Sequence, residues 1–452
     1  MQKRPSPDMI LNERKWADSV CFWSITLTWP FYILGALYVV GPLLAWMLFC
    51  VVVVSAYLNP DRVPDFPIFF RLPLIVWCWL FSSVCLLVII WVGHANWDLG
   101  VAQTIKSSFG WAKGWALIAI FILAGAVLKI SAKSLVRAQA IQGVVTLIIL
   151  PLLLIAPTLG LPQKLYTSPL EIIGGPGPEY FTVYLYTIDP STMTPRWQFY
   201  APWAPFAGLL GVTLALFAFE DKHPFWKYAG ALGGVSIIVF SQSRMSMISL
   251  VACFAVPRIL IRLKDPFWLF ILAGIVLLAG IFEPTLKEMI ASNVDSFNGA
   301  RAASSRVRET LQSIAFYRWQ TEAYWWGHGT VERGPHLVEF MPIGSHHTWY
   351  ALLYVKGALG FVTFLVPFFW HCVLATKDAV LSPRGRLPMA LLLNLVILTF
   401  GENIEIEAYL LWPVFVMLGI HCKDVYQSQL TENSNSRQYS NAFSSLQQDH
   451  SV

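Results

Sequence analysis

Charged residues are scarce in this chain. Asp, Glu, Lys and Arg make up 13% of the 452 residues while 56% are hydrophobic, and a soluble domain usually carries about 25% charged residues. Apolar runs recur along the chain at the length of roughly 20 residues that a helix needs to cross a bilayer. The runs are continuous rather than alternating, which argues against a membrane barrel. The composition therefore predicts an all-α fold, a polytopic transmembrane helical bundle.

Other features are missing too, and each absence excludes a class of protein. The seven cysteines lie in or beside apolar runs without CxxC spacing or close pairs, so no disulfide framework or zinc site is indicated. The start, MQKRPSPDMILNERKWADS, has no small-residue cleavage site, so we expect the first helix to be an uncleaved insertion signal. No internal repeat is present. The net charge of +5 is spread over loops, which indicates no nucleic-acid partner.

The apolar runs predict about twelve spans. They are expected near residues 19–39, 42–58, 70–92, 114–130, 136–158, 201–219, 226–241, 245–262, 266–283, 347–371, 387–400 and 408–421. Residues 1–18 then form a short N-terminal segment, nine spans lie within 19–283, and three lie within 347–421. The breaks at Gly41-Pro42 and at GENIEIE are short, so one long helix or a re-entrant segment is the alternative at either place.

Two connections are too long to be simple turns. Residues 159–200 are rich in proline and glycine (EIIGGPGPEYF), and residues 284–346 have soluble-domain character. Within the second connection, RETLQSIAFYRWQTEAYWWG has apolar residues at helical spacing, which predicts a helix at the membrane surface. Residues 422–452 are polar and poor in aliphatic side chains, so we expect a disordered tail.

The distribution of lysine and arginine predicts the orientation. With the N-terminus inside, the inner segments hold seventeen of these residues and the short outer segments hold five. Long loops translocate regardless of charge, so the 284–346 loop is left out of this comparison. Both termini are therefore expected in the cytoplasm, and both long connections on the outer face.

Isolated polar residues fall on the outer side of this topology. Arg196 precedes the sixth span, Arg244 lies at the turn before the eighth, and His346 and His347 open the tenth. Three glutamates occupy the turn between the last two spans: Glu402, Glu405 and Glu407. An arginine at an apolar segment is costly and usually has a partner. Two arginines at one level would suit phosphate oxygens, because their planar charged forks match that geometry.

Each candidate also has a structural alternative. Arg244 could snorkel from a short loop to the interface, and an arginine in an outer loop, such as Arg196, is unremarkable alone. A histidine such as His346 could cap the start of a helix, and His347 would point about 100° away around that helix. The glutamates could cap or solvate a turn, and Lys356 could reach a polar neighbour.

Three segments resemble one family of membrane proteins. HHTWYALLYVKGALG is similar to the H-x10-G signature of the O-antigen ligase-like and O-antigen polymerase superfamily, with His346 and Gly357 at its ends. SQSRMSMISL resembles the family's R-x3-L motif, with Arg244 and with Ile248 in place of leucine. TPRWQFYAPWAPFAG resembles its other arginine element at Arg196, without the family's asparagine and glycine. The resemblance covers about residues 195–420 and includes the outer loop with its Gly327-His328-Gly329 turn.

The resemblance implies a glycosyltransferase of the bacterial inner membrane with its active site facing the periplasm. Its donor would be a glycan on undecaprenyl diphosphate, its acceptor a hydroxyl of a glycolipid or glycan, and no metal or cofactor would be required. Catalysis would fall to His346 as general base and to Arg196 and Arg244 on the diphosphate. The substrate-binding residues would be Arg306, Arg318, His347, Trp326 and Glu402.

The sequence leaves the acceptor open. A ligase and a polymerase of this superfamily differ in their acceptor, and the motif pair favours the ligase slightly. A flippase or secondary transporter would also be polytopic and basic. Such proteins usually place charges near the midplane on repeat-related broken helices, whereas here the charges gather on one face and no repeat is present. A non-catalytic assembly partner is the third alternative, and it would tolerate the loss of His346.

Overall fold

A computed structural model describes residues 7–58, 72–189, 192–262, 264–281 and 302–449, together with residues 283 and 287. The chain is mostly helical with little sheet. Seven of its described helices are long and apolar enough to cross a membrane. The coarse expectation of a helical membrane protein is therefore confirmed. Most of residues 282–301, where the predicted outer loop begins, lies outside the described residues.

The helices follow the predicted apolar runs closely. The first half contains α1 (Pro7–Thr26), α2 (Thr28–Ile33), α3 (Leu37–Leu58), α4 (Leu74–Asn96), α5 (Gly100–Lys113), α6 (Trp115–Val127) and α7 (Ala132–Ile155). The second half contains α8 (Ala204–Phe219), α9 (Pro224–Phe240), α10 (Arg244–Arg262), α11 (Pro266–Ile281), α13 (Ala302–Glu322), α14 (Thr348–Leu381), α15 (Arg386–Thr399) and α16 (Ile404–Asp449).

The connection 159–200 departs from the all-α expectation. It contains two small antiparallel sheets, in which β1 (Lys164–Thr167) pairs with β2 (Thr182–Tyr184) and β3 (Thr187–Ile188) pairs with β4 (Pro195–Arg196). The described parts of the two long connections also contain three short 3-10 helices: Pro169–Ile173, Pro178–Phe181 and His336–Val338. A fourth, Pro383–Gly385, joins α14 to α15.

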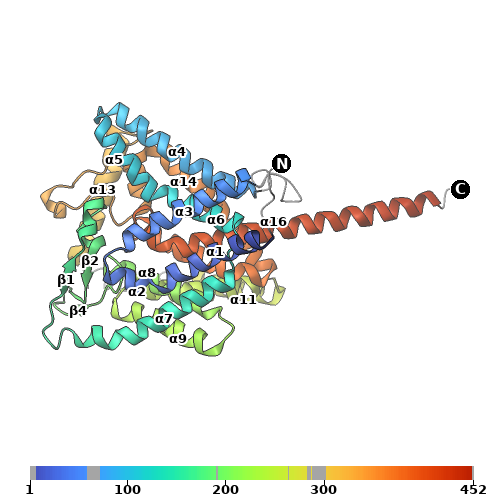
Figure 1. The fold of residues 1–452 in the computed structure, drawn as a ribbon, viewed down its shortest axis with the longest axis horizontal. Helices are drawn as coiled ribbons and strands as arrows, with labels where there is room; N and C mark the ends of the chain where they lie inside the picture. Colours follow the sequence, from blue (N-terminus) through green and yellow to red (C-terminus); the bar gives the residue numbers. More distant parts are fainter. Residues whose placement is uncertain are drawn as a thin grey trace.

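The long helices run side by side, so the bundle has two distinct ends (Figure 1). The small sheets and α13 lie at one end, which we call the strand end. Helix α1 begins and α16 leaves the bundle at the opposite end, which we call the terminal end (Figure 1).

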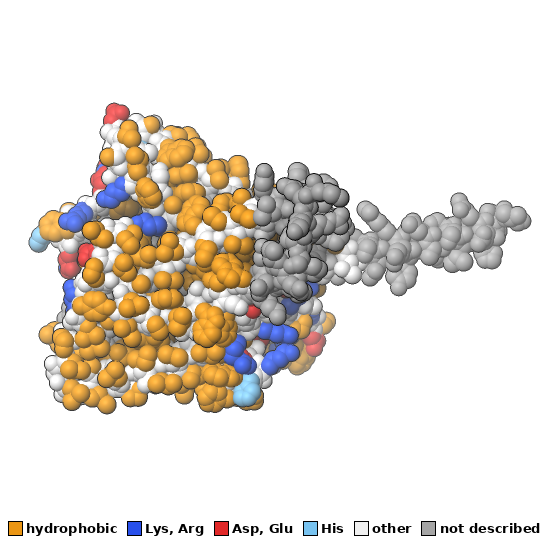
Figure 2. Space-filling view, viewed as in Figure 1, with side chains coloured by type: hydrophobic (Ala, Val, Ile, Leu, Met, Phe, Trp, Pro, Cys, Tyr) orange, Lys and Arg blue, Asp and Glu red, His pale blue; other side chains and the backbone are white. Residues whose placement is uncertain are grey.

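The outer surface of the bundle is apolar. Figure 2 shows hydrophobic side chains over most of the visible face between the two ends. Large side chains such as Phe81, Ile148 and Phe270 are 71–77% exposed, an exposure that a water-soluble surface of this size would not tolerate. In contrast, α8 is buried on every side, as expected for a helix that is apolar all round. Such a distribution fits a central helix within a ring of lipid-facing helices.

Close packing of α7 on α9 depends on glycine. A Cβ atom at Gly233 would lie 2.1 Å from the carbonyl oxygen of Gly143, and one at Gly143 would lie 2.3 Å from that of Gly230. Small residues at such crossings let helix backbones approach within van der Waals contact. These positions fix how α7, α8 and α9 pack, and α8 and α9 carry two of the turns at the strand end.

Three element boundaries differ from the prediction. The first break falls at Gly35, whose φ is +62°. Helix α3 runs through Pro42, which supplies no backbone N–H and so leaves one hydrogen bond of the helix unmade. Helix α5 occupies a stretch read as a connection, since its composition is too polar to mark a span. The tail predicted to be disordered is instead helical to Asp449. It has no proline or glycine after Pro413 apart from Gly419, so nothing in its sequence ends α16.

Candidate functional site

The imidazole of His346 lies beside a carboxylate at the strand end. Its Nδ1 atom is 3.5 Å from Oε2 of Glu402, which is almost completely buried. The indole of Trp203 donates a 2.9 Å hydrogen bond to the same Oε2 and packs edge-on against the His346 ring, with 5.7 Å between ring centroids. Three turns distant in the sequence therefore meet at one histidine.

Glu402 is held in place by the first turn of α14. The hydroxyl of Thr348 donates to the Glu402 carbonyl oxygen at 2.8 Å and accepts from the Ile404 amide at 3.0 Å. Trp349 donates to the hydroxyl of Thr399 at 3.0 Å. The turn that carries His346 is thus bound directly to the turn between α15 and α16, which limits how far the carboxylate and the ring can move apart.

Arg244 is the first residue of α10, at the same end of the bundle. The next residue, Met245, packs so closely on Gly401 that a Cβ atom there would lie 2.4 Å from the methionine Cε. The preceding residue, Ser243, donates to the carbonyl of Pro205 at 3.3 Å. Arg244 is therefore flanked by contacts to the two turns that carry Glu402 and Trp203. A helix N-terminus also favours anions, because its free amides and its dipole are positive.

Arg196 borders the same turn from the other side. Its Nε donates to the carbonyl of Ser241 at 2.6 Å, and the amide of Trp197 donates to the carbonyl of Phe240 at 3.2 Å. A terminal nitrogen of Arg196 lies 3.6 Å from Oδ2 of Asp189. Asp189 was not among the predicted site residues, and it offsets part of the positive charge that Arg196 offers.

The turns that carry Trp203, Arg244 and His346 each contain a non-glycine residue in the left-handed region. These are Phe199, Gln242 and His346, with φ values of +53°, +50° and +61°. Such conformations are uncommon for residues other than glycine. They persist where the surroundings over-determine them, often at functional sites. At His346 this backbone lies next to the ring's contact with Glu402, so the strain falls on the candidate base itself.

The three glutamates have separate environments. Glu402 faces His346, whereas Glu405 lies 3.5 Å from the ammonium of Lys356. Glu407 is fully buried and accepts a 3.1 Å hydrogen bond from the hydroxyl of Tyr180. Glu402 therefore shares its site with the histidine, and the Glu405–Lys356 pair has a structural explanation.

His347 is a helix cap in this structure. It is the N-cap residue of α14, and its Nδ1 accepts a hydrogen bond from the Tyr350 amide at 3.4 Å. Its ring is buried against Tyr350 and Phe400, and burial lowers the pKa of His347 to about 4. A neutral ring is what the capping bond requires, because the acceptor nitrogen must carry no proton. These contacts give His347 a structural role in place of the predicted contact with substrate.

The other end of the H-x10-G motif breaks α14. Gly357 has φ +63° and ψ −168° inside the helix, and a Cβ atom there would lie 2.3 Å from the carbonyl oxygen of Trp325. Residues 324–329 fill the break: the Gly329 amide donates to Val355, and the Ala358 amide donates to Tyr324. This glycine therefore admits a loop backbone into the helix.

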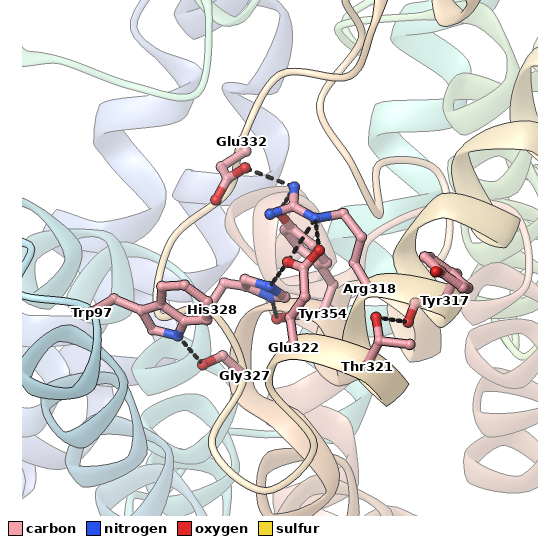
Figure 3. Close-up of polar contacts among 9 residues, drawn as sticks. All are labelled: Trp97, Tyr317, Arg318, Thr321, Glu322, Gly327, His328, Glu332 and Tyr354. Carbon is pink, nitrogen blue, oxygen red and sulfur yellow. Dashed lines mark hydrogen bonds and ion pairs between the residues drawn. The ribbon is translucent and has the colours of Figure 1, made fainter.

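Arg318 is locked in a network of ion pairs and hydrogen bonds beside this loop (Figure 3). Its Nε contacts both carboxylate oxygens of Glu322, and its Nη1 lies 2.7 Å from both Glu332 Oε2 and the Tyr354 hydroxyl. His328 bonds to Glu322 at 2.9 Å. Burial raises the pKa of the Glu322 carboxyl group, but hydrogen bonds from His328 and Arg318 outweigh burial and lower that pKa below its usual value. Its partners explain Arg318 as a tie between α13, the loop and α14.

Two further predicted substrate-binding residues lie on other elements. Arg306 is exposed on α13, and Trp326 is half-buried in the 324–329 segment that fills the break in α14. They belong to neither of the turns that carry His346 and Glu402. Trp203, in contrast, contacts both residues but was not among the predicted site residues. Its only sequence signal was an aromatic residue at the start of an apolar run, which is also typical of interface anchors.

Comparison with protein-family models and with curated proteins gives no match for this chain. The arrangement itself has a clear chemical character. It combines an imidazole next to a buried carboxylate with two arginines around one turn, at the N-terminus of a helix. Such a site can take a proton from a hydroxyl and stabilise negative charge on a neighbouring group.

Proposed function

We propose that this protein is a membrane glycosyltransferase of the O-antigen ligase-like type. It would move a glycan from undecaprenyl diphosphate to an acceptor hydroxyl on the periplasmic face of the bacterial inner membrane. The observation that carries this proposal is the meeting of His346, Glu402 and Trp203 at the strand end, next to the turn bordered by Arg196 and Arg244. Helix α1 begins, and α16 leaves the bundle, at the opposite end (Figure 1).

His346 is the proposed general base. Its Nδ1 faces Glu402 at 3.5 Å, so the carboxylate favours the tautomer with a proton on Nδ1 and leaves Nε2 to accept the proton of the acceptor hydroxyl. The 3.5 Å separation exceeds a normal hydrogen bond, and Nδ1 has no hydrogen-bond partner among the described residues. Catalytic hydrogen bonds are often long before substrate binds and shorten in the complex.

The arginines are proposed to stabilise the leaving group. The acceptor oxygen forms a bond to the anomeric carbon, the bond from that carbon to the phosphate oxygen breaks, and the lipid diphosphate leaves with the electron pair. Arg244 and Arg196 would stabilise the charge that develops on it, with help from the N-terminus of α10. A single direct displacement of this kind inverts the anomeric configuration.

Transfer in detergent tests the proposal against a transporter. Purified protein is mixed with a lipid-linked glycan donor and an acceptor, and the products are resolved by mass. Because detergent leaves no compartments, a transporter cannot produce a new glycosidic product there. Product formation that depends on the protein supports a transferase. Lipid movement in vesicles without any product in detergent would favour the transporter.

The acceptor is identified by deleting the gene and resolving the surface glycans. A ligase is expected to leave finished polymer on its lipid carrier when it is lost. A polymerase is expected to leave single repeat units. We propose the ligase, because the H-x10-G and R-x3-L segments together resemble that branch best.

A further inference from the structure

A cavity lies at the terminal end of the bundle, opposite the candidate active site. Its volume is about 550 Å³. The start of α7, the turn between α8 and α9, the turn between α14 and α15, and α16 all contribute to its wall. Figure 2 shows Lys and Arg side chains gathered near this end of the bundle. One part of the lining is apolar and includes Phe22, Leu387, Met417 and Ile420.

A buried histidine offers a polar group to this cavity. His421 lines the cavity and is 3% exposed. Its Nε2 lies 3.1 Å from Oδ2 of Asp378, and Oδ1 of the same carboxylate accepts from Nε of Arg384 at 3.1 Å. Its Nδ1 is buried and has no hydrogen-bond partner among the described residues. A buried polar atom of this kind destabilises the fold unless a ligand or water satisfies it.

The charges at the rim have both signs. Arg137 is bound through two hydrogen bonds, of 2.6 and 2.9 Å, to the carboxylate of Asp221, so this pair adds little net charge. Arg384 also lines the cavity and is exposed, but it is paired with Asp378. Four other exposed charged side chains complete the rim: Lys133, Lys222, Glu220 and Asp424. Two ammonium groups and two carboxylates therefore surround an opening that continues into an apolar wall.

We propose that this cavity binds the headgroup of a zwitterionic phospholipid that carries a phosphodiester and a primary ammonium, as in phosphatidylethanolamine. The phosphate would lie near Lys133 and Lys222, and basic pockets between transmembrane helices are established headgroup sites. The lipid ammonium would donate hydrogen bonds to Glu220 and Asp424. The acyl chains would follow the apolar wall. His421 donates through Nε2 to Asp378, so its Nδ1 is an acceptor and would take a further hydrogen bond from the lipid ammonium. This site is independent of the proposed transfer reaction.

Native mass spectrometry of the full chain in detergent tests the proposal. Phosphatidylethanolamine, phosphatidylglycerol and phosphatidylcholine with identical acyl chains are added at equal concentration. Phosphatidylethanolamine is expected to be retained about fivefold more than either of the others, since each headgroup contact near the surface contributes about 1 kcal/mol. Phosphatidylglycerol lacks the cation, and the quaternary ammonium of phosphatidylcholine cannot donate a hydrogen bond.

Charge-neutralising variants identify the two halves of the site. Lys133→Gln with Lys222→Gln is expected to weaken retention of phosphatidylethanolamine about fivefold or more. Glu220→Gln with Asp424→Asn is expected to remove its advantage over phosphatidylglycerol. Lys164→Gln, an exposed lysine on β1 at the strand end, is the matched control and is expected to change nothing. Thermal unfolding of each variant without added lipid checks that it is folded.

Three results would overturn the proposal. Equal retention of all three lipids would show that the headgroup is not recognised. An equal loss in Lys164→Gln would show that the effect follows total charge rather than this cavity. Displacement of the lipid by soluble O-phosphoethanolamine at the same concentration would show that a free phosphate compound, and not a lipid, is the ligand.

Discussion

Replacing Glu402 with glutamine removes the carboxylate charge beside His346 but keeps the size of the side chain. The amide oxygen can still accept the indole hydrogen bond that Trp203 makes at 2.9 Å. The ring becomes positive when it takes the acceptor proton. At the observed 3.5 Å and an effective dielectric constant of about 20, the charge interaction would amount to roughly 5 kcal/mol.

Water reduces this figure, because the His346 side chain is 22% exposed. A discounted value of about 3 kcal/mol corresponds to roughly a hundredfold loss in kcat. The charge on Glu402 matters most after the proton has moved, so the KM for the lipid-linked donor is expected to stay within about twofold of the wild-type value. The assay is transfer in detergent, with product quantified across a range of donor concentrations.

Glu407→Gln is the matched control for this experiment. Glu407 belongs to the same turn and is fully buried, but it contacts Tyr180, and a glutamine oxygen can keep that hydrogen bond. The activity of Glu407→Gln is expected to stay near that of the wild type. If Glu402→Gln and Glu407→Gln reduced kcat equally, or if Glu402→Gln raised only KM, Glu402 would not act through His346.

Three further predictions concern stability in detergent, measured as the apparent melting temperature. Gly357→Ala is expected to lower the stability by about 3 kcal/mol, because a Cβ would lie 2.3 Å from the Trp325 carbonyl oxygen at a positive φ. Gly274→Ala, where nothing lies within 4 Å of the added Cβ, should leave the stability unchanged. Equal losses of stability in the two variants would contradict our account of the helix break. Arg318→Met is expected to lower the stability by about 2 kcal/mol, because its charge-assisted hydrogen bonds are lost, and to leave the KM for the donor unchanged. A large rise in this KM would support the predicted role of Arg318 in substrate binding. The pKa of His347 is lowered to about 4 from about 6.5 when unfolded, so acidification from pH 7 to about pH 4 should destabilise the protein by up to roughly 3 kcal/mol. His347→Asn keeps a capping side chain and should lose this pH dependence. An unchanged pH dependence in this variant would exclude His347 as its source.

Apolar runs predicted the helices well, because burial in lipid or protein demands continuous apolar sequence. Breaks and extensions were harder to predict. The sequence placed Gly357 in a continuous span, but a loop more than 25 residues earlier supplies the backbone partners that open the helix there. The helical extension of α16 to Asp449 was not predicted, because the polar composition of this segment indicates only that it lacks core contacts. It contains no proline or glycine after Gly419 that would end the helix.

Side-chain roles depended on partners that sequence reading cannot locate. The resemblance implied that Arg318 binds substrate, but the sequence could not show that Glu322 and Glu332 pair with it (Figure 3). The H-x10-G resemblance chose His346 rather than His347 as the base, but the sequence could not show which ring faces a carboxylate. Only the backbone at His346, with φ +61°, separates the ring that faces Glu402 from the ring that caps α14.

The most direct test compares the two neighbouring histidines in the detergent transfer assay. If His346 is the base, His346→Ala should lower kcat by about 10²–10⁴-fold at unchanged membrane abundance, while His347→Asn keeps most of the activity. Near-normal product from His346→Ala would contradict the account.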